Sequence, residues 1–261
     1  MEFTHKPVLL AECIEALHIR PEGIYVDGTL GRAGHSREIA RRLTTGRLIC
    51  IDRDQAALDA APARLAEWMD RVTLVHGNFR DLAAVMDRLD LPGADGMLFD
   101  LGVSSPQLDD ASRGFSYMHD APLDMRMDQS APLTAYDVVN TWPREELRRI
   151  LFRYGEEKCS SQIAAAIERR RAEKPIETTL ELVDVIRSAM PASALREKQH
   201  PAKRTFQAIR IAVNDELSAI DDLLQDAVPR LNPGGRLCVI SFHSLEDRIV
   251  KTAFAGFAKG C

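Results

Sequence analysis

Three aspartates in the first hundred residues could do binding or acid–base chemistry, because each stands at or near the end of a short apolar run. These are Asp27, Asp52 and Asp100. A carboxylate accepts hydrogen bonds from hydroxyl and amine groups. If the three runs are parallel strands, their carboxyl ends meet at one edge of a sheet, where open α/β sheets bind ligands.

A glycine-containing turn follows the first of these acids. Asp27 leads directly into the segment Gly28–His35, which reads GTLGRAGH and precedes an expected helix. Glycine lets a backbone turn tightly and approach a ligand. A dinucleotide fingerprint requires GxGxxG, whereas this spacing is GxxGxxG. The looser turn is typical of methyltransferases, whose cofactor carries an ammonium and a carboxylate in place of phosphates, so Asp27 and Gly31 are expected to bind such a cofactor.

The next two runs end in further candidate ligands of a nucleoside. Asp52 follows Asp27 by 25 positions, where a carboxylate can accept both ribose hydroxyl hydrogen bonds. The third run leads to Phe79, whose ring could pack on an adenine face. An ordinary core phenylalanine at a helix start is an equally good interpretation of Phe79.

Asp100 is the expected acceptor for a target amine. It precedes a turn containing Pro106, and amine methyltransferases hold an Asp or Asn before a proline-containing turn at this place. The exocyclic amine of cytosine is conjugated with its ring, and acceptors draw it towards tetrahedral geometry. Direct in-line attack on a sulfonium methyl then needs mainly positioning and electrostatics. A turn cap or a cofactor contact is the alternative for Asp100.

The cysteines favour this direct mechanism. A carbon-5 pyrimidine methyltransferase needs a cysteine nucleophile, but Cys50 and Cys238 lie inside expected strands. The five cysteines are scattered without a CxxC pair, so the pattern indicates neither a metal site nor a disulfide framework.

Further polar residues are weaker candidates for contacts with a nucleic acid. His243 follows the expected strand Arg236–Phe242 and could contact substrate or move a proton, although a structural turn histidine is equally plausible. Phosphates could be held by basic residues, but the run Arg169–Arg171 is interpreted as a solvated face. The tentative RNA-contacting residues are Ser104, Ser105, Pro106, Lys203, Arg204 and Arg210.

The elements that position these residues predict an α/β fold. Short apolar runs alternate with helical patterns, which indicates parallel βαβ units covered by helices on both faces. The expected strands are Ile24–Asp27, Arg47–Asp52, Val72–Val75, Gly96–Leu101 and Arg236–Phe242, and the expected helices between the first four are Ser36–Leu43, Gln55–Trp68 and about Arg80–Leu89.

The rhythm stops after Leu101, which predicts an inserted helical domain. An irregular stretch is followed by the helical patterns Arg144–Phe152, Ser160–Glu173 and Thr179–Ala189. We therefore expect a discontinuous methyltransferase domain over residues 1–104 and 204–261, interrupted by a substrate-recognition domain over 105–203. The second part is expected to open on one long amphipathic helix, about Phe206–Leu231, which ends before the segment NPGG.

Composition is that of a globular protein. The 261 residues are 45% hydrophobic, no apolar run is long enough to span a membrane, and the start does not resemble a signal peptide, so a cytoplasmic location is expected. The net charge of −5 means that nucleic-acid contacts need a local patch. One candidate is the range 158–204, with ten basic residues against six acidic ones.

Several long strings resemble one known family. They are VDGTLGRAGHS, ICIDRD, DLGVSSPQLDDASRGFSYMHDAPLDMRMD, HPAKRTFQAIRIAVNDEL and GGRLCVISFHSLEDRIVK, and they resemble the signature segments of the MraW/RsmH methyltransferases. The resemblance runs from about Lys6 to Lys251.

The resemblance implies a class I S-adenosyl-L-methionine-dependent, Rossmann-like methyltransferase with a helical insertion. It implies action on a decoding-centre cytidine of 16S ribosomal RNA in the assembled small subunit, giving N4-methylcytidine, and leaves a homodimer open. The cofactor-binding positions that it implies are Ala33, Gly34, His35, Asp52, Phe79, Asp100 and Gln107.

The sequence departs from the family pattern in three places. Ala33 and Ala121 each stand where the family usually has glycine. Members also continue past Lys251 and complete the sheet with two more strands. Those strands are expected to be absent here, which would leave Arg236–Phe242 as an uncovered sheet edge.

Other functions compete with an RNA cytidine methyltransferase. A methyltransferase for another amine acceptor is one, and the missing Asp/Asn-Pro-Pro-aromatic motif counts against a DNA version. A non-catalytic ribosome assembly factor is another, disfavoured by the intact Asp27, Asp52 and Asp100. The glycine spacing disfavours a nicotinamide dehydrogenase.

Overall fold

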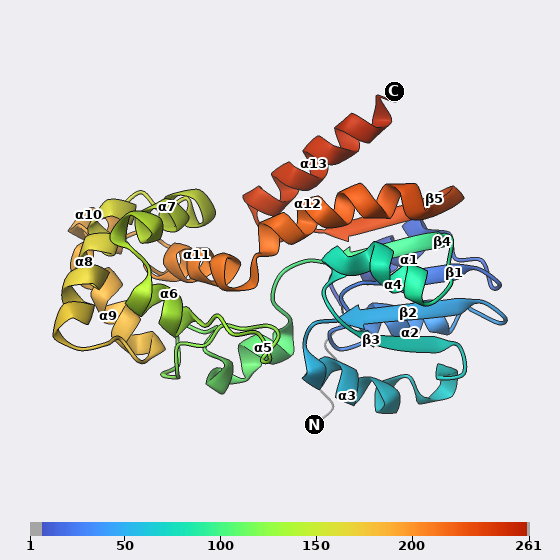
Figure 1. The fold of residues 1–261 in the computed structure, drawn as a ribbon, viewed down its shortest axis with the longest axis horizontal. Coiled ribbons are helices and arrows are strands. Elements are labelled where there is room, and N and C mark those ends of the chain that lie inside the picture. Colours follow the sequence, from blue (N-terminus) through green and yellow to red (C-terminus); the bar gives the residue numbers. More distant parts are fainter. Residues whose placement is uncertain (1–6, 260–261) are drawn as a thin grey trace. The chain divides into compact units, whose positions relative to one another are not determined.

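The computed structural model describes residues 7–259, which form two compact units (Figure 1). Unit 1 comprises the described residues up to Ser104 and from Leu217 onward, and unit 2 comprises Ser105–Glu216. The insertion therefore begins where it was expected to begin but ends 13 residues later than the expected residue 203.

Unit 1 is built on a parallel sheet. Its strands lie in the order β3-β2-β1-β4-β5, and every neighbouring pair is parallel. The strands are β1 (Ile24–Asp27), β2 (Arg47–Asp52), β3 (Val72–His76), β4 (Ala94–Asp100) and β5 (Leu231–Ile240). The chain reverses its direction of travel across the sheet between β1 and β4, which is the switch point where such sheets bind ligands. The expected α/β, Rossmann-like class is confirmed.

Helices cover both faces of this sheet. One face packs against α1 (Leu10–Leu17), α2 (Gly34–Ala40) and α3 (Gln55–Arg64), and the other packs against α4 (Leu82–Arg88), α12 (Glu216–Ala227) and α13 (Ser244–Ala258). Helix α1 had not been expected, and the helix expected to reach Trp68 ends at Arg64 before a short 3-10 turn, Ala66–Trp68.

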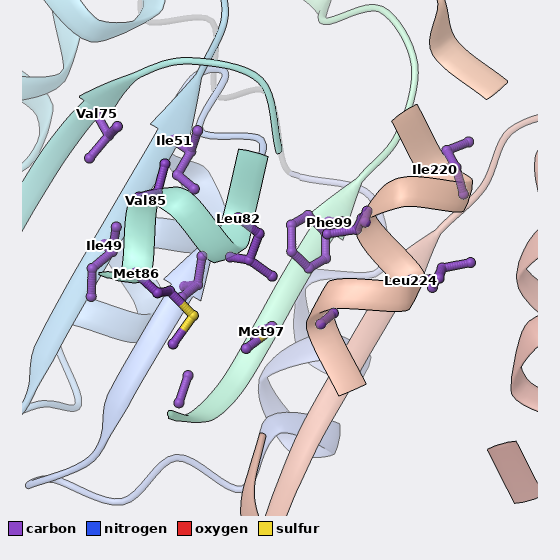
Figure 2. Packing of buried hydrophobic residues seen from close by; sticks show 14 of the residues in the cluster. Ile49, Ile51, Val75, Leu82, Val85, Met86, Met97, Phe99, Ile220 and Leu224 are labelled. Atoms are coloured by element: carbon purple, nitrogen blue, oxygen red, sulfur yellow. The ribbon is translucent and has the colours of Figure 1, made fainter. Parts of the chain in front are cut away.

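Strand side chains alternate between two separate cores. Ile49 and Ile51 of β2 pack with α4 and α12, whereas Cys50 between them joins the core on the opposite face. Figure 2 shows Phe99 and Leu82 within the first of these cores. Burying such a side chain contributes about 1.5–3 kcal/mol, so both faces fix the register of the strands and hence the place of each strand end.

The long helix expected from Phe206 is two helices. Helix α11 (Lys203–Asn214) ends at Asp215, whose backbone is left-handed with φ 47°, and α12 begins at Glu216. Asp and Asn tolerate this conformation better than other non-glycine residues. The break explains the shifted boundary, because α11 belongs to unit 2 while α12 packs on the sheet.

Strand β5 is longer at its start than expected and shorter at its end. The segment NPGG, expected to precede the strand, lies within Leu231–Ile240, with a register irregularity opposite Ala94 and Gly96. Ser241 and Phe242, expected inside the strand, follow it. Within the described residues β5 is an outer strand of the sheet.

Unit 2 is helical. It contains α5 (Ser105–Asp109), α6 (Ala135–Thr141), α7 (Arg144–Gly155), α8 (Ser160–Glu173), α9 (Thr179–Ala189), α10 (Ala192–Leu195) and α11. Asn214 of α11 fixes the irregular stretch before α6, since its side chain donates to the Met125 carbonyl and accepts from the Met127 amide, both at 2.8 Å. Helices α5, α6 and α10 had not been expected.

No helix among residues 7–259 is long and apolar enough to cross a membrane. Cys13, Cys50 and Cys159 are buried, Cys238 is partly buried, and all four are free thiols. Cys261 lies outside the described residues.

The packing of Phe99 predicts its contribution to stability. Phe99 is fully buried, and Phe99→Ala is expected to lower the free energy of unfolding by about 3–5 kcal/mol, because a cavity remains in the core. Phe257→Ala is the matched control on α13, where the ring is 43% exposed, and is expected to cost under about 1 kcal/mol. Urea unfolding of both variants measures the difference, and equal losses would contradict the packing described here.

Candidate functional site

The loop Gly28–His35 joins the end of β1 to α2 and is held from below by Asp27. Asp27 is 1% exposed, and its two carboxylate oxygens accept hydrogen bonds from the Ser36 hydroxyl at 2.5 Å and the Thr29 amide at 3.1 Å. Burial raises the pKa of Asp27, while the Ser36 hydrogen bond lowers it. Asp27 was expected to bind a cofactor, and its contacts in the structure are with the loop.

Left-handed backbone gives this loop its shape. Gly31 has φ 49° and Ala33 has φ 59°, so Ala33 takes a conformation that glycine adopts at lower cost. A methyl group added at Gly34 would lie 2.2 Å from Pro7, so the start of the chain closes over this point of the loop. The family's usual glycine at the position of Ala33 is therefore explained by the backbone.

Asp52 at the end of β2 ties the loop to the next strand. One of its carboxylate oxygens accepts from the Gly31 amide and the other from the Asp54 amide, both at 2.8 Å. Burial raises the pKa of Asp52 to about 6, and the two amide donors act in the opposite direction. Each oxygen has a second lone pair, so hydroxyl donors can still bind.

Asp100 ends β4 beside the same loop. Its amide donates to the Thr29 hydroxyl at 2.6 Å, and its carboxylate lies 4.0 Å from the His35 imidazole. The other ring nitrogen of His35 lies 3.1 Å from the Val8 carbonyl. Ser104, expected to contact RNA, lies next to the loop, because a methyl group added at Gly31 would be 3.9 Å from its Cβ.

The structure gives Phe79 a packing role. It opens the 3-10 turn Phe79–Asp81, its ring meets that of Phe99 edge-on at 6.0 Å, and the Arg53 guanidinium lies 6.0 Å from its other surroundings over the ring. Phe79 remains partly exposed at the end of β3. The proposed contact with an adenine face stays a prediction.

His243 is turned towards its own helix. It caps α13, with Nδ1 accepting from the Glu246 amide and Nε2 lying 3.2 Å from the Glu246 carboxylate. Glu246 is fully buried and also accepts from the Phe242 and His243 amides. This geometry gives His243 a structural role at the strand end, and its catalytic role stays a prediction.

The remaining expected residues belong to unit 2. Gln107 is buried in α5, which Ser105 and Pro106 begin. Lys203 is exposed at the start of α11, and the neighbouring Arg204 lies 3.9 Å from Glu197.

Two arginines of unit 2 are engaged within the fold. Arg210 forms a bidentate ion pair with Glu216 at 2.9 and 3.0 Å, so binding a phosphate would require it to leave this partner. Arg171 donates to the carbonyls of Val139 and Trp142 at the end of α6, both at 2.7 Å. The expectation that the whole run Arg169–Arg171 is a solvated face is therefore wrong for Arg171.

Sequence reasoning missed three residues that organise the site. Thr29 and Ser36 were not singled out, although both are hydroxyl residues within the glycine turn and the helix start. Glu246 could have been found from its spacing, since an acid three residues after a cap residue is the signature of a capping box.

Comparison with known proteins identifies the class to which this fold and site belong. The model of the MraW methylase family matches residues 2–261, so the chain belongs to a family of methylases, the MraW methylase family. This confirms the expected methyltransferase class, and with it S-adenosyl-L-methionine as the cofactor.

Individual relatives are close in sequence. A Brevibacillus brevis protein named Ribosomal RNA small subunit methyltransferase H is 59% identical over 262 residues, covering 100% of this chain and 83% of the relative. A Symbiobacterium thermophilum protein of the same name is also 59% identical, covering 100% and 82%. A solved rRNA methylase from Streptococcus thermophilus is 19% identical, with a TM-score of 0.30 over 43% of this chain and 65% of that one.

The residues of unit 1 suit this cofactor. Asp52 offers carboxylate lone pairs at the strand end, and a methyl group added at Gly77 on the adjoining strand end would meet no atom within 4 Å. The loop backbone between them carries no bulky side chain at Gly28, Gly31 or Gly34. A ribose and an adjoining base therefore have an acceptor and open backbone at the ends of β2 and β3.

The raised pKa of Asp52 predicts a pH dependence of cofactor binding. Hydroxyl donors favour the carboxylate, so lowering the pH through about 6 protonates Asp52 and weakens binding, by at most about tenfold per pH unit. Because this pKa lies above its ordinary value, ionising Asp52 costs folding stability, and that cost appears as the pH rises through the same range.

Calorimetry of S-adenosyl-L-methionine binding between about pH 7.5 and 5.5 measures the effect. The matched control is Asp52→Asn, which cannot ionise and is expected to bind more weakly with no dependence on pH in this window. An unchanged dissociation constant for the unaltered chain across the window would show that Asp52 does not contact the cofactor.

Proposed function

We propose that this chain transfers a methyl group from S-adenosyl-L-methionine to the exocyclic N4 amine of a decoding-centre cytidine in 16S ribosomal RNA of the small subunit. The observation that carries the proposal is the place of Asp100. It stands at the end of β4 and is bonded through its amide to Thr29 of the glycine loop. The name shared by the relatives at 59% identity supports ribosomal RNA of the small subunit as the substrate.

The proposed cofactor residues surround one loop. Asp52 would accept the ribose hydroxyls, and the loop amides around Gly31, Ala33 and Gly34 would face the methionine part. The cofactor supplies an electrophilic methyl group on a sulfonium. Asp27 would contribute by holding the loop, since its oxygens accept from Thr29 and Ser36.

Asp100 is the proposed acceptor for the amine. Its side chain is 26% exposed at the sheet edge, so it can reach both a solvent-side substrate and the loop. A carboxylate that accepts an amine N–H draws the nitrogen away from conjugation with the ring and directs its lone pair towards the methyl group. Such a preorganised acceptor lowers the barrier without proton transfer in advance of attack.

The thiols of unit 1 support direct transfer over a covalent enzyme intermediate. Burial raises the pKa of Cys13 to about 11, and the nearby Cys238 and Asp100 raise it further. Burial also raises the pKa of Cys50 and of Cys238. A thiol nucleophile must be deprotonated to attack a pyrimidine ring, so these three thiols are poor nucleophiles near neutral pH.

The basic residues of unit 2 are proposed to hold the RNA backbone. Lys203 is exposed and Arg204 is one-third exposed, whereas Lys174 is paired with Glu177 and Glu181. Phosphate contacts by Lys and Arg release counterions and make binding dependent on salt. Ribosomal subunits as substrate also support the cytoplasmic location expected from the sequence.

The activity and the role of Asp100 are tested together. The purified chain is incubated with labelled S-adenosyl-L-methionine and unmethylated small subunits, and the RNA nucleosides are analysed by mass spectrometry. N4-methylcytidine is the expected product, and Asp100→Ala is expected to lower kcat by about 10²–10³-fold. Asp100→Asn keeps one acceptor oxygen and should retain more activity.

The other outcomes separate the competing functions. Label on a protein or on another nucleoside would point to a different acceptor, and cofactor binding without any product would favour an assembly factor. A loss in Asp100→Ala that is explained wholly by the cofactor dissociation constant would assign Asp100 to cofactor binding.

Salt dependence tests the RNA-binding residues. We expect Lys203→Ala and Arg204→Ala each to weaken binding of small subunits and to reduce the slope of log affinity against log salt by about 1. Lys174→Ala in the same unit is the control and should leave the slope unchanged, because its ammonium is already paired. Equal slopes in all variants would contradict the proposed phosphate contacts.

A further inference from the structure

We propose that Phe242 forms one wall of the base site and stacks on the pyrimidine ring of the target cytidine. This inference rests on the proposed function and deepens it. Phe242 directly follows Ser241 at the end of β5 and is 57% exposed, although it is a large apolar side chain beside a buried core. Nothing in the chemistry of helix capping or core packing accounts for it.

A structural role for the ring can be tested against the helix start. A hydrophobic residue before an N-cap often packs on the residue four places into the helix. Here His243 is the N-cap and the fourth helical residue is Asp247, which is charged and half-exposed. The ring of Phe242 therefore has no apolar partner of this kind within α13.

The position of the ring relative to Asp100 is fixed by the sheet. Asp100 pairs in register with Ile240, and the Leu101 amide donates to the Ile240 carbonyl at 3.0 Å. A methyl group added at Gly102 would lie 3.8 Å from the Phe242 ring. The exposed ring thus borders the turn that begins two residues after the proposed amine acceptor.

The backbone that carries the ring is held rigidly. The Glu246 carboxylate, fully buried, accepts from the Phe242 amide at 2.8 Å and from the His243 amide at 3.3 Å. The imidazole of His243 turns inward onto the same glutamate. An aromatic side chain on a fixed backbone loses little further freedom when a ligand binds.

Stacking on this ring is compatible with the proposed chemistry. An enzyme that acts on a base extrudes it from its helix, holds it against aromatic or apolar side chains, and reads its Watson–Crick edge with hydrogen bonds. The N4 amine lies in the plane of the cytosine ring at that edge. A ring stacked on one face therefore leaves the amine free to reach a carboxylate acceptor at the end of β4.

The experiment compares four chains for the formation of N4-methylcytidine in unmethylated small subunits. They are the unaltered protein, Phe242→Ala, Phe242→Leu and Phe242→Tyr. We expect kcat/KM to fall on the order of 10- to 100-fold in the Ala variant. The Leu variant should fall nearly as far, because it keeps apolar volume but has no π-face, and the Tyr variant should stay within severalfold of the unaltered chain.

Two controls show that the loss is local. Phe257→Ala removes an exposed ring from the far part of α13 and should leave kcat/KM unchanged. The calorimetric affinity for S-adenosyl-L-methionine should be the same in every chain, because Phe242 lies at the end of β5 and not beside Asp52. A Phe242 variant that loses cofactor affinity in proportion to its activity would overturn the assignment to the base.

Failure of this inference differs from failure of the proposed function. If the unaltered chain forms N4-methylcytidine and the Ala variant retains its kcat/KM, the stacking role of Phe242 is wrong and the proposed function stands. The same holds if the Leu variant equals the unaltered chain. If the unaltered chain forms no N4-methylcytidine, the proposed function is wrong, and a cytidine contact for Phe242 falls with it.

Discussion

The buried carboxylate of Asp27 is the interaction on which the candidate site depends. It holds both ends of the glycine loop, through the Thr29 amide at one end and the Ser36 hydroxyl in the first turn of α2 at the other. The loop then binds its neighbours, since Thr29 accepts from the Asp100 amide and Gly31 donates to Asp52. A buried carboxylate is stable only when its oxygens are hydrogen-bonded, so the fold of the loop and the burial of Asp27 require one another.

The sequence was sufficient to predict this edge of the sheet. Buried parallel strands read as short apolar runs, and each of the first four runs proved to be a strand within a few residues. Parallel strands place their carboxyl ends together, so the shared location of Asp27, Asp52 and Asp100 followed from topology alone. It did not follow that Asp27 faces the loop from below, because burial of a strand end depends on what packs over it.

The break at Asp215 could not be read from the apolar pattern. Val213 and Leu217 are four residues apart, which is the spacing of a continuous helix, and the left-handed turn between them keeps that spacing while redirecting the chain. The short helices α5, α6 and α10 were missed for a related reason. Helices of four to seven residues are too short to show a periodicity and depend on tertiary contacts such as the Asn214 hydrogen bonds.

The orientation of the Phe242–His243 pair illustrates a second limit. A histidine at a strand end attracts a catalytic interpretation, yet adjacent residues in extended backbone point in opposite directions. The capping contact between His243 and Glu246 decides which of the two faces outward. A cap that satisfies two backbone amides therefore also determines which side chain borders the turn after Asp100.

These constraints divide the edge of the sheet into two parts with separate chemistry. The ends of β1 and β2 offer backbone and carboxylate acceptors for a nucleoside cofactor, whereas the ends of β4 and β5 offer an acceptor and an exposed ring for a base. Asp100 belongs to both parts because its amide is bonded to the loop through Thr29 while its side chain remains at the edge. Its position thus couples the loop to the place where an amine would react. Methyl transfer needs this coupling, since an in-line reaction tolerates little error in the distance between donor and acceptor.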